Sequence, residues 1–137
     1  MIGATMKEIA VGQTFSMAKT ITETDVYNFA GVIGDFNPAH VNEEYAKTTP
    51  FKTRIAHGML SASLISAAVA SQMPGGMYVS QTIKFTAHVH FNDTITATVT
   101  VKEVNQERCR AILDTICTNQ NGVVVIKGEA VAMPRKE

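Results

Sequence analysis

The segment 57–73 places the strongest constraint on how this chain can fold. Its residues are apolar or small almost all round the helix that their spacing predicts, and the segment contains no Asp, Glu, Lys or Arg. A helix without a charged face has to be covered by other parts of the protein. Pro74, Gly75 and Gly76 end it. Because a bilayer span needs about 20 apolar residues, this shorter segment is predicted to be a core helix.

Beyond residue 76 the apolar residues recur with a period of two. They alternate with polar residues over 83–91 and again over 95–102, which predicts strands. Further strands are expected at 108–118 and 123–133, and Asn121-Gly122 between them is a strong hairpin signal. The pattern therefore indicates a four-strand antiparallel meander around the central helix, in the α+β class.

The N-terminal half is predicted to contribute one strand and short helices. The strand covers 13–21, and Thr22 caps a helix that Gly34 ends. Asn42 is expected to cap a shorter helix over 43–47. The chain of 137 residues shows no repeat, low-complexity tract or linker, so we expect a single domain over 1–137.

Composition and charge narrow the class of partner. Twelve basic residues balance twelve acidic ones, which argues against a nucleic-acid partner. Cys109 and Cys117 do not form a C-x-x-C pair, and free thiols in a reducing cytoplasm are expected. The first ten residues lack the apolar core of a signal peptide. We therefore expect a cytoplasmic protein without a membrane segment.

An acid/base pair follows the first predicted helix. Asp35 and His40 are five residues apart, across a bend that Pro38 helps to fix. A carboxylate and an imidazole near one water molecule can divide proton transfers between them. The pair by itself also fits an ordinary turn, because Asp is common in turns and His40 would then be a polar loop residue.

The start of the central helix adds a possible anion site. Gly58 lies where backbone N–H groups are unpaired and the helix dipole is positive, so a developing oxyanion could bind there. Serines on the helix do not match a nucleophile elbow and are expected to be packing residues, although one could orient Asp35. His88 and His90 share a strand face but lack a third ligand. Nothing requires a metal or a cofactor.

These motifs resemble the MaoC-like hydratases, and in particular the short, single-domain (R)-specific enoyl-CoA hydratases. The resemblance rests on Gly-Asp-Phe-Asn-Pro-Ala-His-Val at 34–41, Tyr-Ala-Lys at 45–47, Phe51, Ile-Ala-His-Gly-Met-Leu at 55–60 and Gly-Glu-Ala at 128–130. It implies the hotdog fold, in which a curved antiparallel sheet wraps a long helix. It also implies a homodimer formed by joining sheet edges.

The resemblance assigns roles to five residues. Asp35 and His40 match the catalytic pair that holds a water and adds it to an enoyl thioester. Gly58 matches the residue whose backbone N–H binds the thioester oxygen. Ser66 matches a helix serine that supports the aspartate, and Asn37 matches the residue that shapes the turn. The implied substrate is an acyl-CoA, with no metal and no cofactor.

The implied reaction is reversible hydration of trans-2-enoyl-CoA to (R)-3-hydroxyacyl-CoA. Dehydration of 3-hydroxyacyl groups on acyl carrier protein uses the same site and stays open. A hotdog thioesterase and a non-catalytic acyl-CoA-binding subunit are further alternatives, although a scaffold needs neither Asp35 nor His40. Lys52 and Arg54 could meet the CoA phosphates, or they could be solvated loop charges.

Overall fold

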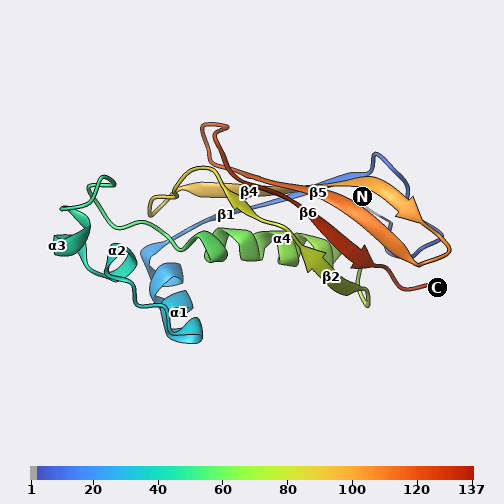
Figure 1. Ribbon diagram of the computed structural model, residues 1–137, viewed down its shortest axis with the longest axis horizontal. Coiled ribbons are helices and arrows are strands. Elements are labelled where there is room, and N and C mark those ends of the chain that lie inside the picture. The colour runs from blue at the N-terminus through green and yellow to red at the C-terminus, as the bar shows by residue number, and fades with distance from the viewer. Residues whose placement is uncertain (1–2) are drawn as a thin grey trace.

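The computed structural model describes residues 3–137, and its centre is a long helix beneath a curved sheet. This helix, α4 (Gly58–Gln72), runs along the inner face of the sheet (Figure 1). The sheet is antiparallel throughout, in the order β1-β4-β5-β6-β2, and β3 also pairs with β6. The strands are β1 (Thr14–Thr20), β2 (Met77–Gln81), β3 (Lys84–Phe85), β4 (Thr94–Asn105), β5 (Arg110–Thr118) and β6 (Val124–Met133).

Two predictions about the strands were wrong. The alternating segment 83–91 is a strand only at Lys84–Phe85, and the chain then runs irregularly along the opening of a cavity. Residues of both alternating sets, Phe85 to Val89, line that cavity, so the alternation there does not mark the two faces of a ladder. In addition, β2 and β3 pair with the last strand and not with the next one. The meander therefore has the three strands β4, β5 and β6.

One face of α4 forms the core against the sheet. Its buried residues pack among buried residues of the strands and are Ser61, Ala62, Leu64, Ile65, Ala68 and Val69. The opposite face, which includes Met59, Ser63, Ser66 and Ala67, is exposed in the single chain. The prediction that the helix is covered all round is thus met on one side only. The uncovered side has small side chains and no charge.

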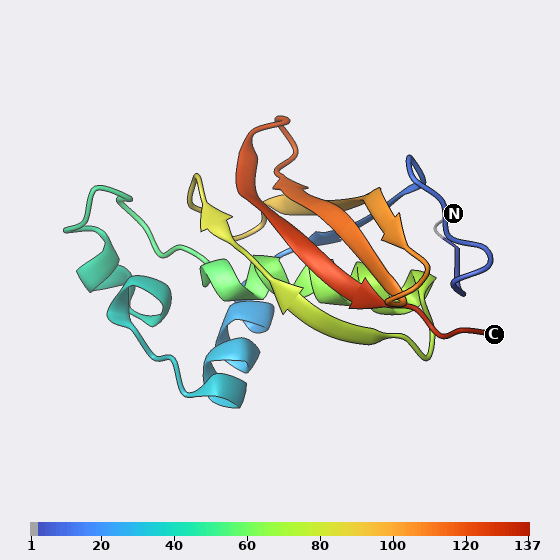
Figure 2. The ribbon, with the colours of Figure 1, turned by 45° about the vertical axis from the view of Figure 1, so that its right-hand side comes forward.

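Three short helices extend beyond one end of the sheet (Figure 2). They are α1 (Glu23–Ile33), α2 (Pro38–Val41) and α3 (Glu43–Ala46), and residues 23–56 are called the helical extension below. The predicted cap Thr22 is confirmed, and the structure adds that Thr22 and Asp25 together form a capping box at the start of α1. Gly34 ends α1 with φ of 78°, a left-handed conformation that glycine adopts without strain. The predicted caps and stops of this region are confirmed.

Candidate active site

The candidate site lies where the helical extension meets the first turn of α4. Gly34 turns the chain out of α1, and Asp35 follows in a segment without regular structure. Asn37 then caps α2, since its side-chain oxygen accepts a hydrogen bond from the Ala39 N–H at 3.0 Å. The single turn of α2 carries His40 back toward α4. The motif residues thus define one segment, and the side chains of Asp35 and His40 both line the same cavity.

Asp35 is held by its own loop and remains accessible to solvent. Its Oδ1 accepts a hydrogen bond from the Asn37 N–H at 3.1 Å, and its side chain is 44% exposed. This bond closes a local turn of the kind that Asp commonly forms. The turn interpretation of Asp35 is therefore confirmed, while its role as a reactive group stays a prediction that the unengaged second carboxylate oxygen, Oδ2, allows.

His40 is oriented by a backbone carbonyl. Its Nδ1 lies 2.7 Å from the Ile55 oxygen, and since a carbonyl only accepts, Nδ1 carries the hydrogen and Nε2 presents a lone pair. Partial burial lowers the pKa of His40 below its ordinary 6.5, and the nearby His57 acts in the same direction. The Ile55 hydrogen bond and Asp35 oppose this shift. His40 is consequently neutral at pH 7 and can accept a proton.

His57 is the third member of this cluster, and the sequence analysis gave it no role beyond the start of a helix. Its side chain is 2% exposed, and its ring centroid lies 4.0 Å from that of His40. Side-chain ligand atoms of Asp35, His40 and His57 all lie within 4.8 Å of one another. The signals for it in the sequence were its adjacency to Gly58 and its place in the motif at 55–60.

Gly58 begins α4 beside this cluster. As the first residue of the helix it has an N–H without an acceptor in its own helix, at the positive end of the helix dipole. A Cβ at this position would lie 2.6 Å from Cε1 of Phe85, so the ring covers the glycine closely. The predicted start of the helix at Gly58 is confirmed, its anion-binding role stays a prediction, and Phe85 lies directly against it.

A cavity of about 460 Å³ joins these groups. Asp35, His40, His57, Gly58 and the buried Ser61 line it on one side. The residues on the other sides are mainly apolar and aromatic, among them Phe51, Ile55, Met59, Phe85, Ala87 and Ile126. An apolar pocket with a few convergent polar groups is the usual form of a small-molecule site.

Ser66 lies apart from the reactive pair in the single chain. It is exposed on the open face of α4, where it lines an apolar hollow of about 440 Å³ with Phe29, Ile33 and Tyr78. Within residues 3–137 no hydrogen bond joins Ser66 to Asp35, so its supporting role stays a prediction. Ser61 is the buried serine of the cavity, and its hydroxyl has no hydrogen-bond partner among the described residues.

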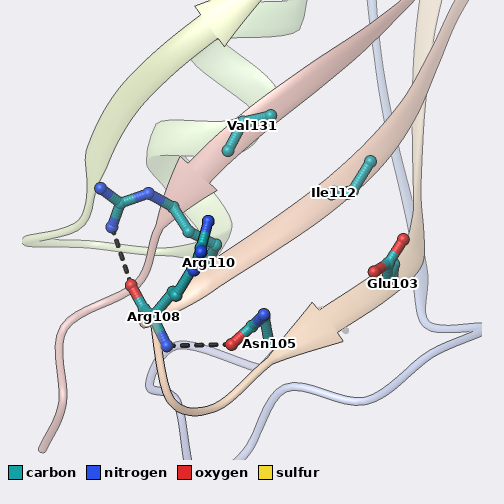
Figure 3. Close-up of a pocket in the computed structure, with 6 residues that line it drawn as sticks. All are labelled: Glu103, Asn105, Arg108, Arg110, Ile112 and Val131. Atoms are coloured by element: carbon teal, nitrogen blue, oxygen red, sulfur yellow. Dashed lines mark hydrogen bonds between the residues drawn. The ribbon is translucent and has the colours of Figure 1, made fainter.

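A second hollow, of about 530 Å³, has different chemistry. Figure 3 shows it beside the β4–β5 turn, lined by Glu103, Asn105, Arg108, Arg110, Ile112 and Val131. The Arg110 guanidinium donates to the carbonyl of Arg108 at 3.0 Å, and the Arg108 N–H donates to Asn105. These bonds stabilise the turn. No acid/base pair lines this hollow, so we place the site at the Asp35–Gly58 cavity.

Other side chains considered from the sequence have different surroundings. Arg54 donates to Glu43 at 2.9 Å and to Glu23 at 3.0 Å, and its guanidinium lies 4.8 Å from the centroid of the Phe91 ring. Arg54 therefore links α1 to α3 within the helical extension. Its guanidinium is engaged by these carboxylates and is not a free ligand for phosphates. His88 is exposed at the cavity and packs against Phe51, with ring centroids 4.8 Å apart. Over residues 3–137, no helix has the length and apolar character needed to cross a membrane.

Comparison with known proteins agrees with this geometry. The chain matches the family described as "MaoC like domain" over residues 6–122, and it belongs to that family. It is 54% identical over 129 residues to the (R)-specific enoyl-CoA hydratase of Rhodospirillum rubrum, covering 93% of this chain and 89% of the relative. It is 43% identical to the 3-hydroxybutyryl-CoA dehydratase of Methylorubrum extorquens, covering 96% of this chain and 85% of that protein.

The fold comparison gives the same family. The unliganded R-hydratase PhaJ1 from Pseudomonas aeruginosa has a TM-score of 0.93 and 42% identity, with 98% of this chain and 88% of that chain covered. The hotdog fold expected from the resemblance is confirmed by this likeness and by the long helix beneath an antiparallel sheet.

Proposed function

We infer that this protein adds water reversibly to trans-2-enoyl-CoA and forms (R)-3-hydroxyacyl-CoA. The observation that carries this function is the meeting of Asp35, His40 and the N-terminus of α4 in one apolar cavity. The names of the relatives, enoyl-CoA hydratase and hydroxybutyryl-CoA dehydratase, describe the two directions of this reaction. The protein is therefore a hydro-lyase.

We propose that Asp35 and His40 share the reacting water. Their ligand atoms lie within 4.8 Å of each other, a separation that one bridging water can span with two hydrogen bonds. The water oxygen bonds to C3 as one of the two groups takes up its proton. The C2–C3 π bond breaks, its electrons move toward the thioester, and the Asp35–His40 pair, which took up the proton of the water, delivers a proton to C2. The number of protons on the protein is the same before and after turnover.

Negative charge develops on the thioester oxygen during this addition. The Gly58 N–H, at the dipole-positive end of α4, is the proposed donor to that oxygen. The apolar surroundings of the cavity strengthen this hydrogen bond because they exclude water. In this proposal Asn37 contributes by holding the Asp35 turn and capping α2.

Hydration of crotonyl-CoA, followed by loss of the enoyl-thioester absorbance with chiral analysis of the product, tests the function. Because general acid–base catalysis contributes about 10²–10⁴-fold, we expect Asp35→Asn and His40→Gln each to lower kcat by at least ~10². Normal turnover by the double variant would contradict the assignment of the pair. Crotonyl groups on acyl carrier protein, offered to the same preparation, test the carrier-protein alternative.

We propose that the reaction needs neither a metal ion nor a cofactor. Asp35, His40 and His57 form a cluster of the kind that can hold a metal ion. However, two of the four ring nitrogens are already engaged with backbone carbonyls, and the remaining groups suffice for proton transfer. Dialysis against EDTA should leave kcat unchanged, and a loss of activity restored by a divalent ion would contradict this proposal.

We propose further that two copies associate through β2 and the open face of α4. Within the described residues β2 pairs only with β6, and it exposes Met77, Tyr78 and Val79 at its edge. The uncharged face of α4 lies beside it, and both contribute to the hollow that includes Ser66. A self-complementary edge and an uncovered apolar face fit a two-fold dimer with a continuous sheet.

The thiols fit the expected cytoplasmic location, which remains part of the proposal. Both cysteines are free, and burial raises the pKa of the Cys117 thiol to about 11. Such a thiol is unreactive and needs no oxidising compartment. Fractionation of cells that produce the protein tests the location.

A further inference from the structure

His57 is a buried imidazole that the proposed reaction does not use. Its Nε2 lies 3.0 Å from the main-chain oxygen of Asp35, 22 residues away in the sequence. Because a carbonyl only accepts, Nε2 carries a hydrogen and donates it to that oxygen. Nδ1 has no hydrogen-bond partner within residues 3–137. The 3.9 Å from Nε2 to the Asp35 carboxylate is too long for a hydrogen bond.

The same ring also supports His40. The two imidazoles are tilted by 35° with centroids 4.0 Å apart, and Phe29 of α1 packs edge-on against His57 at 5.1 Å. His57 is the N-cap residue of α4, directly before Gly58. One side chain therefore contacts the loop of Asp35, the ring of His40 and the start of the helix that carries the oxyanion donor.

We propose that His57 is a positioning residue that fixes Asp35 and His40 relative to Gly58 through the hydrogen bond to the Asp35 carbonyl and the contact with the His40 ring. This inference rests on the proposed function of the site. Asp35 lies in a segment without helix or strand, so no ladder bond fixes it relative to α4. A misplacement of about 1 Å in a catalytic group can cost ~10²-fold in rate.

Two matched substitutions separate this role from simple core packing. In His57→Gln the amide nitrogen reaches the position of Nε2 and can still donate to the Asp35 carbonyl. In His57→Asn the amide lies near the position of Nδ1, where the structure offers no partner. Both variants replace a buried imidazole by an amide, and the methylene that Asn lacks is a packing difference that the melting temperatures report separately.

We expect His57→Gln to keep kcat for crotonyl-CoA within ~5-fold of the wild type and His57→Asn to lower it by ~10², with KM changed less than ~3-fold in both. Melting temperatures of the variants control for folding. Equal activity of the two variants, or a loss confined to KM, would overturn the proposal. An inactive wild type, in contrast, would overturn the proposed function.

Nuclear magnetic resonance of the wild type supplies a readout that does not depend on activity or on the folding of a variant. With ¹⁵N-labelled histidine, the His57 ring should carry a hydrogen on Nε2, and its signal should be unchanged by substitution of the exposed His88. A His57 ring without a hydrogen on Nε2 would overturn the proposed hydrogen bond whatever the enzyme assays show.

Discussion

At the scale of single residues, the candidate site depends on two imidazoles that are held by backbone carbonyls. His40 donates to Ile55, and His57 donates to Asp35. Each bond fixes one tautomer and so determines which nitrogen faces the cavity. For His40 the consequence is an exposed lone pair on Nε2, which is the form that a proton acceptor needs.

The shifted pKa of His40 predicts the acid limb of the pH profile. Burial lowers this pKa below 6.5, so kcat/KM should stay level as the pH falls through 6.5 and decline only at lower pH. In the unfolded chain His40 binds a proton near pH 6.5, whereas in the folded chain it binds a proton only at lower pH. The contribution of His40 to stability is therefore full above 6.5 and is lost as the pH falls through the folded pKa. A decline in kcat/KM that is already complete at 6.5 would contradict the prediction.

Gly58 should tolerate no side chain while Phe85 stays in place. In Gly58→Ala the added Cβ would lie 2.6 Å from Cε1 of Phe85, so the ring has to move. Because the ring lines the cavity beside the oxyanion donor, we expect kcat/KM for crotonyl-CoA to fall by at least ~10-fold, as for loss of part of one oxyanion contact. The double variant with Phe85→Ala should recover part of this loss. Equal rates for the single and double variants would show that the ring is not the cause.

At the scale of secondary-structure elements, Arg54 links two helices of the helical extension, α1 and α3. The Arg54 guanidinium contacts Glu23 of α1, Glu43 of α3 and the ring of Phe91. The Glu23 carboxylate is 59% exposed, so that pair contributes little. The bond to Glu43 and the aromatic contact carry more, since they are partly buried.

Lysine should not replace this arginine. Arg54→Lys keeps the charge but loses the planar group that bonds several partners and stacks on Phe91. We expect this loss to reduce the free energy of local opening of α1 and α3 by about 1–3 kcal/mol. Their backbone amides should therefore exchange hydrogen faster. Hydrogen exchange measured by mass spectrometry checks this, with the exposed Lys52→Ala as the matched control. Unchanged protection in α1 and α3 would contradict the role of Arg54.

At the scale of the whole molecule, the open face of α4 is the feature that differs most from a monomer whose apolar surfaces are all covered. In the single chain an apolar strand edge and an uncharged helix face remain uncovered. The proposed two-fold dimer covers both. It would also place Ser66 inside an interface instead of on a free surface.

A charge on this face should separate the copies. Ala67 is exposed in the single chain, so Ala67→Arg should leave the fold intact but oppose dimer formation by burying a charge. Sedimentation velocity should give a dimer for the wild type and a monomer for this variant. Glu103→Arg, exposed on the outer face of the sheet, should remain a dimer. A wild-type monomer, or dimers in all three proteins, would contradict the proposed interface.

The sequence by itself determined what depends on residues close together in the chain. The caps Thr22, Asn37 and Asn42, the left-handed stop at Gly34 and the uncharged helix were predictable because each rests on contacts within a few residues. The same holds for Asp35 and His40, whose spacing and loop are local. The motif resemblance supplied their roles and the role of Gly58.

Only the tertiary structure decided what rests on contacts between distant segments. It paired β2 and β3 with β6, placed His57 beneath both Asp35 and His40, and engaged Arg54 with two helices. A period of two in the apolar residues shows that the two faces of a strand differ in polarity. It does not show which other strand is the hydrogen-bonded partner. Likewise, a buried histidine or a paired arginine cannot be told from a free one until the chain is folded, because burial and ion pairing are properties of neighbours in space.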